Sequence, residues 1–150
     1  MASTAQRRIA KELRDLSNNP IEGITIHPQE DNLAHWDVTI TGPPSSPYKG
    51  GHFKATIDFP GNFPFKAPSL VFATKVYHPG INEQGEICVP ILRDEWKPTI
   101  SMSTVLNIVY EKLANPSPDD PYEADIAALL KSDEAKFKAT AKEWTKKYAS

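Results

Sequence analysis

The residues whose types and spacing could do chemistry lie around a single cysteine. Cys88 stands in the run Ile87-Cys88-Val89-Pro90, with Tyr77-His78-Pro79 before it and Trp96-Lys97-Pro98 after it. A thiolate can attack an activated carbonyl to form a thioester, which keeps the acyl group reactive toward an amine or another thiol. The pattern therefore predicts acyl transfer through Cys88. The alternative is a free thiol that packs in the interior as a small apolar side chain.

Length and composition set the frame for this chemistry. With 150 residues, the chain is expected to form one domain, residues 1–150, that can bury a sufficient core without a disulfide or a metal. A single cysteine excludes an internal disulfide, and no apolar stretch follows the first residues. We therefore expect a reducing location, in the cytoplasm and the nucleus.

Several classes of protein are disfavoured by the same data. The net charge of -2 argues against a nucleic-acid binder, whose domain would normally be basic. No apolar run approaches the roughly 20 residues of a membrane span. The four histidines and Cys88 lack the spacing of zinc ligands, and Gly50-Gly51 lacks the spacing of a phosphate loop. We expect no metal and no bound cofactor.

The flanking sequence predicts an α+β fold. Ser3 or Thr4 can cap a first helix that ends near Asn18. Alternation of apolar and polar residues then predicts four strands, and the Gly-rich and Pro-rich turns between them favour an antiparallel meander with one buried face. The strands are expected at 24–27, 36–41, 53–59 and 70–73.

The remainder of the chain is expected to be irregular and then helical. Three prolines interrupt residues 60–68, and residues 74–98 show little periodicity although they contain many apolar side chains. Ser101 can cap a buried crossover helix that ends near Ala114. Two C-terminal helices follow, the first capped by Asp119-Asp120-Pro121 and the second by Ser132 or Asp133.

The whole chain resembles the ubiquitin-conjugating enzyme family, in its minimal class that consists of the core domain alone. The motifs that carry the resemblance are Phe59-Pro60, Phe63-Pro64-Phe65-Lys66, Tyr77-His78-Pro79, Ile87-Cys88 and the Pro-Asp-Asp-Pro run at 118–121. Taken together at these spacings, they are hard to obtain by chance.

The resemblance implies a carrier function. Cys88 would receive ubiquitin as a thioester from an ATP-dependent activating enzyme and deliver it to a substrate lysine or to a ligase cysteine. ATP would be used by the activating enzyme, not by this chain. The implied partners are ubiquitin, the activating enzyme and ubiquitin ligases, and the chain is expected to be a monomer.

Supporting roles are also implied for residues near Cys88. An attacking lysine must first lose its proton, and the resemblance assigns help in that step to Asp120 and to a polar shell around Tyr77. Asp120 also fits as the N-cap of the third helix, directly before Pro121, and the two roles are compatible. His78 could act as a general base for Cys88, but a proline follows it and the resemblance gives this position a structural role.

Two departures from the family pattern affect the expected acceptor. Most relatives carry an Asn after His-Pro, whose amide orders the loop or stabilises the oxyanion, and this chain has Gly80. Asn82 could substitute if the backbone redirected it. Pro90 stands where many lysine-active relatives have Asp or Ser, and relatives with proline there resemble the branch that works with cysteine-bearing ligases. Both departures predict easy discharge to cysteine and poor discharge to lysine.

The resemblance also implies two partner surfaces. Pro64, Phe65, Lys97 and Pro98 match the edge that docks ligases, although prolines and aromatics could simply cover the end of the sheet. The basic residues of the first helix match the surface that meets the activating enzyme, although such a stripe can also be an ordinary solvated face. These basic residues are Arg7, Arg8 and Lys11.

Two other functions stay open at this point. The chain could be a scaffold of the conjugating-enzyme type that binds ubiquitin or ligases with little turnover, although the presence of Cys88 argues against it. It could also carry another ubiquitin-like modifier. The contiguous run 92–96 lacks the insertion found in the SUMO-conjugating relative and favours ubiquitin.

Overall fold

The computed structural model describes residues 3–119 and 121–150 and confirms the α+β architecture. The helices and the four strands follow one another in the predicted order, although one helix and one strand begin at other residues than predicted. In chain order they are α1 (Thr4–Asn18), β1 (Ile24–Gln29), β2 (Asn32–Thr41), β3 (His52–Asp58), β4 (Ser69–Phe72), the short 3-10 helix η1 (Pro90–Leu92), α2 (Met102–Ala114), α3 (Ala124–Ser132) and α4 (Glu134–Tyr148).

The four strands form the expected antiparallel meander, in the order β1-β2-β3-β4. Trp36 lies opposite Ile57, Val38 opposite Ala55, and all four side chains are buried. Because alternate residues of a strand point to opposite faces, this register gives the sheet one apolar face and one solvent face. The apolar face forms the floor of the core.

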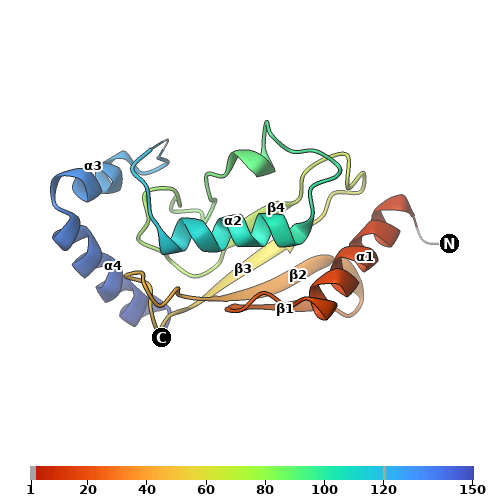
Figure 1. Ribbon diagram of the computed structural model, residues 1–150, viewed down its shortest axis with the longest axis horizontal. Helices are drawn as coiled ribbons and strands as arrows, with labels where there is room; N and C mark the ends of the chain where they lie inside the picture. Colours follow the sequence, from red (N-terminus) through yellow and green to blue (C-terminus); the bar gives the residue numbers. More distant parts are fainter. Residues whose placement is uncertain (1–2, 120) are drawn as a thin grey trace.

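Helix α2 covers that floor, as Figure 1 shows, while α1 lies at one end of the molecule and α3 and α4 at the other. Ser101 caps α2 by accepting a hydrogen bond from Thr104 N–H. The fully buried side chains of α2 include Val105, Leu106 and Val109. This composition is expected of a helix inside a core. None of the described helices is long and apolar enough to cross a membrane.

Helix α1 is fixed to the rest of the molecule by two charged side chains. The Arg8 guanidinium pairs with Glu12 and donates to the backbone carbonyls of Pro98 and Ile100. Glu12 is only 3% exposed, and its other oxygen accepts the backbone N–H of Met102 at the start of α2. The buried carboxylate is therefore fully engaged, as a charge inside a protein must be.

The predicted start of the third helix is wrong. Helix α3 begins at Ala124, with Glu123 in the N-cap position and no side-chain cap. The backbone N–H groups of Tyr122 and Glu123 both donate to Pro79 C=O instead. These tertiary bonds hold the chain outside a helical path, so the Asp-Asp-Pro signal does not start the helix. Asp120 itself lies outside the described residues.

Candidate active site

The segment that carries Cys88 is irregular but closely bonded to the sheet. Phe72 N–H at the end of β4 donates to Gly85 C=O at 2.8 Å. Gly85 has a φ of +85°, and a Cβ atom there would overlap the carbonyl of Phe72. Only glycine fits this combination of left-handed backbone and close approach. The turn before Cys88 is thereby held against the edge strand.

A buried histidine holds the next part of the segment. His78 is 2% exposed, its Nδ1 accepts the N–H of Gly80, and its Nε2 donates to Lys112 C=O, both at 2.8 Å. Burial is the main cause that lowers the pKa of His78 to about 4. The ring is therefore neutral at physiological pH, with both nitrogens engaged in hydrogen bonds. This arrangement supports the structural role and leaves no free nitrogen for general-base catalysis.

Cys88 lies directly against this turn. Its backbone N–H donates to Gly80 C=O at 2.8 Å, and Ile81 pairs with Ile87 beside it. The cysteine is free and half-buried. A chain of bonds thus runs from α2 through His78 and Gly80 to the backbone of Cys88, which fixes the position of the thiol without enclosing it.

Two predicted supporting residues, Asn82 and Tyr77, are engaged with residues other than Cys88. The Asn82 amide donates to the Glu86 carboxylate, while its oxygen accepts the N–H groups of Gln84 and Glu86. The Tyr77 ring packs against Phe137 and Trp144 of α4. Burial, with a smaller contribution from Asp125, raises the pKa of the Tyr77 hydroxyl. Both residues therefore stabilise the segment that carries Cys88. Asn82 does so through hydrogen bonds within the turn at residues 82–86.

On the other side of Cys88, the chain forms η1. Pro90 opens this turn, and its C=O accepts the N–H groups of Arg93 and Glu95. The indole of Trp96 then donates to Pro64 C=O at 2.8 Å, which joins this loop to residues 60–68. The Arg93 guanidinium lies 4.8 Å from the centre of the Tyr122 ring.

Across residues 3–119 and 121–150, no group of three or more His, Cys, Asp or Glu side chains is arranged to hold a metal ion. The described part of the site presents a half-buried thiol whose backbone is held by a hydrogen bond to Gly80.

Comparison with known proteins identifies the class to which this arrangement belongs. The family model described as ubiquitin-conjugating enzyme matches residues 8–145. The chain belongs to the ubiquitin-conjugating enzyme family. Among solved structures it is similar to the E2 domain of a ubiquitin-conjugating enzyme from Toxoplasma gondii, with 36% identity, a TM-score of 0.87, and coverage of 97% of this chain and 99% of that one. The family works with ubiquitin, activating enzymes and ligases.

The predicted ligase edge of this family member is uneven in exposure. Phe65 is 70% exposed, which is unusual for a large apolar side chain, and Lys97 and Pro98 are exposed as well. Pro64 is buried, and its carbonyl is the acceptor for Trp96. Pro64 thus supports the edge through its contact with Trp96, while Phe65, Lys97 and Pro98 are exposed and available to a partner.

The basic residues of α1 also differ in exposure, with two facing solvent and one half-buried. Arg7 and Lys11 are exposed, and Lys11 pairs with Asp15 one helical turn away. Arg8 is half-buried, and three of its nitrogen atoms bond to Glu12, Pro98 and Ile100. Arg8 therefore stabilises the fold, and the solvent-facing part of the stripe consists of the other two residues.

Sequence reasoning missed Arg93 and Tyr122. The only local signal was Tyr122, an aromatic residue directly after the Pro-Asp-Asp-Pro run, and the sequence analysis assigned that residue to the third helix. Their contact joins positions that are far apart in the sequence, so spacing alone could not reveal it.

Proposed function

We propose that this protein carries ubiquitin as a thioester on Cys88. The observation that carries the proposal is a single free, half-buried cysteine whose backbone is bonded to the His78–Gly80 turn, within a fold of the ubiquitin-conjugating enzyme family. A thiol held in this way can be reached by a large protein donor while its backbone stays in place.

The proposed reaction is an exchange of acyl groups between sulfur atoms. The Cys88 thiolate attacks the carbonyl of the thioester on the activating enzyme, and the cysteine of that enzyme leaves as a thiolate. In the second step an acceptor nucleophile attacks the new thioester, and Cys88 leaves as a thiolate. ATP is used by the activating enzyme, and this chain binds no cofactor.

We also propose that the thioester discharges more readily to cysteine than to lysine. An ammonium ion has an ordinary pKa of about 10.4 and a thiol one of about 8.5, so the amine needs more help to lose its proton. Gly80 supplies no side-chain amide, His78 has both nitrogens engaged, and the Asn82 amide donates to Glu86. These contacts leave neither a side chain at Gly80 nor a free nitrogen on His78 to assist an amine, and they hold the Asn82 amide at Glu86. Asp120 remains the proposed helper for a lysine acceptor.

A reconstituted charging reaction tests the first proposal. The protein is mixed with activating enzyme, ATP and ubiquitin, and a reductant-sensitive ubiquitin adduct is expected that disappears in Cys88→Ala. Lack of the adduct with the natural sequence would overturn the carrier function and favour a binding scaffold instead.

A single-turnover discharge assay tests the second proposal. Purified charged protein is mixed with free cysteine or free lysine, and the decay of the adduct is followed for each. Faster decay with cysteine is expected, and the corresponding ligases are those with a catalytic cysteine. Equal or faster decay with lysine would contradict the proposed preference.

We further propose that the protein acts as a monomer in the cytoplasm and the nucleus.

A further inference from the structure

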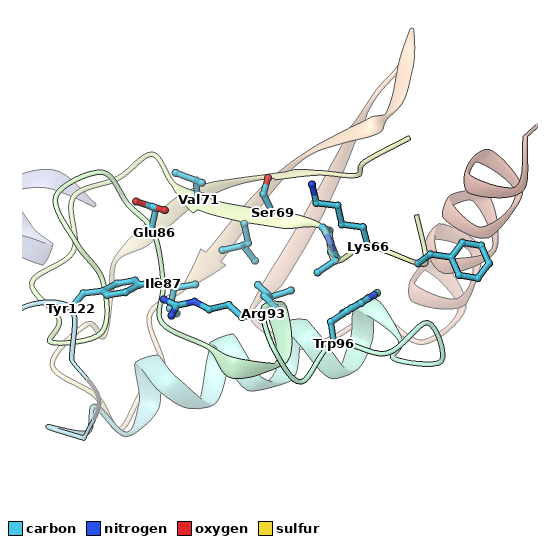
Figure 2. Close-up of a pocket in the computed structure, with 13 residues that line it drawn as sticks. Lys66, Ser69, Val71, Glu86, Ile87, Arg93, Trp96 and Tyr122 are labelled. Atoms are coloured by element: carbon cyan, nitrogen blue, oxygen red, sulfur yellow. The ribbon is translucent and has the colours of Figure 1, made fainter. Parts of the chain in front are cut away.

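A groove lies between residues 65–71, which include most of β4, and the segments 86–87 and 92–96 on the two sides of Cys88. Its volume is about 560 Å³. Figure 2 shows Lys66 and Trp96 at one end and Glu86 and Tyr122 at the other end, with the Arg93 side chain reaching from the middle toward Tyr122. We name this surface the 66–93 groove.

The two ends of the 66–93 groove have different neighbours. One end is lined by Phe65, the most exposed of the large apolar side chains among the described residues. The other end is lined by Ile87, the residue directly before Cys88. A chain that lies in the groove therefore runs from the predicted ligase edge toward the thiol.

The charges in the groove are predominantly positive. Lys66 and Arg93 line it, and within the described part of the chain neither forms an ion pair. The single lining carboxylate, Glu86, already accepts a hydrogen bond from the Asn82 amide. The Glu86 carboxylate offsets only one of these two positive charges, so the net charge of the groove favours an anionic occupant at Lys66 and at Arg93.

Arg93 is oriented for such an occupant. Its guanidinium lies over the Tyr122 ring, and stacking on an aromatic face restricts the orientation of the planar group. The N–H groups of a guanidinium lie in its plane, so a carboxylate can be bound through two parallel hydrogen bonds. The walls beside it are apolar, because Leu70, Ile87 and Trp96 line the groove. The groove thus combines apolar walls with two cations.

We infer that the 66–93 groove receives an extended acidic segment of the polypeptide that accepts the acyl group from Cys88. Carboxylates of the segment lie at Lys66 and Arg93, its apolar atoms contact Leu70 and Trp96, and a neutral or basic residue lies at the Glu86 end. This inference rests on the proposed carrier function, since it names the chemistry of the acceptor.

Binding to the uncharged protein provides the first test. Short fluorescein-labelled peptides that differ only at two central positions, holding glutamate, glutamine or lysine, are titrated and followed by anisotropy. The glutamate peptide is expected to bind about 5-fold tighter than the glutamine peptide at low ionic strength, and this difference should shrink with added salt. Combined Lys66→Glu and Arg93→Glu substitutions should reverse the preference toward lysine.

A matched control changes the net charge by the same amount elsewhere. Lys142→Glu with Lys146→Glu, at exposed positions on α4, should leave the preference unchanged. Amide chemical shifts locate the peptide, and changes at Leu70, Ile87 and Arg93 are expected. Equal affinity for all three peptides, or shift changes confined to Arg7 and Lys11 of α1, would overturn the inference.

A second measurement separates this inference from the carrier proposal. Cysteine-bearing versions of the peptides are offered to the charged protein, and the glutamate version should discharge it faster than the glutamine version. If charging succeeds but the peptides do not differ, the groove inference fails alone. If charging fails while the peptides bind selectively, the carrier proposal fails and the groove keeps only its binding role.

Discussion

The two flanks of Cys88 are held by different kinds of bond. The upstream turn, residues 78–80, combines backbone bonds at Pro79 C=O and Gly80 C=O with one buried imidazole that joins Gly80 N–H to Lys112 C=O. The downstream turn, residues 90–95, depends on backbone bonds to Pro90 C=O and on the fixed φ of proline. An ionisable side chain responds to pH and to substitution, whereas backbone bonds do not titrate. The upstream turn should therefore be the sensitive one.

Removal of the imidazole is the largest change that this comparison predicts. His78→Ala leaves Lys112 C=O and Gly80 N–H without their partner and opens a cavity beside Tyr48. We expect the free energy of unfolding to fall by about 3–5 kcal/mol. Urea titration at neutral pH measures this loss. A loss below about 1 kcal/mol would mean that the upstream turn has another support.

Of the two turns that flank Cys88, the upstream one should respond to acid. The folded pKa of His78 is about 4, below its ordinary value of 6.5, so the unfolded chain takes up the proton first as pH falls. Stability is therefore unaffected above pH 6.5 and decreases between pH 6.5 and 4, by at most about 3 kcal/mol.

The control for this pH dependence is His78→Gln, which can still donate and accept but does not titrate. The difference in unfolding free energy between the two proteins should narrow or reverse as pH falls from 6.5 to 4. His35, whose pKa is raised mainly by its hydrogen bond to Asp58, contributes in the opposite direction but cancels in this difference. Parallel pH curves would contradict the prediction.

A side-chain amide added to the upstream turn should change chemistry rather than stability. A Cβ atom at Gly80 would lie 3.3 Å from His78 Cε1, so the ring must move by only a few tenths of an ångström. We expect Gly80→Asn to speed discharge to lysine by about 10-fold or more, without a change in charging, because it restores one donor.

Two variants give this experiment its contrast. Gly80→Ala has the same Cβ atom without the amide and should leave lysine discharge slow. Pro90→Asp alters the downstream turn and should have a smaller effect than Gly80→Asn. If Pro90→Asp had the larger effect, the downstream flank would control the choice of acceptor.

The smallest predicted effect concerns the anchor of the downstream loop. Trp96→Phe keeps an aromatic ring but removes the hydrogen bond to Pro64 C=O. The free energy of unfolding should fall by about 1 kcal/mol, and this loss should be the same at pH 7 and pH 5. A loss that grows in acid would remove the distinction between the flanks.

Much of the fold could be predicted because its signals are local. Burial of alternate residues marks β2 and β3, and Ser3 and Ser101 cap their helices through the neighbouring turn. Strand β2 begins at Asn32, earlier than predicted, because its first residues lie outside the apolar face and lack the alternation.

The missed features depend on distant partners. Pro79 C=O takes the N–H groups of Tyr122 and Glu123, which overrides a good helix-start signal. The partner of His78 lies in α2, so its sequence neighbours could not show that both nitrogens are engaged. In the candidate site the position of Cys88 was therefore predictable, whereas the hydrogen-bond partners of Asn82 and Arg8 were not.

The carboxylate of Glu12 has a consequence for the dynamics of the whole molecule. It lies on α1, yet it accepts the first N–H of α2 and is held there by Arg8. Local opening of α1 would strip the first turn of α2 of this acceptor. Amide hydrogen exchange should therefore protect α1 and the beginning of α2 to a similar degree, as one cooperative unit.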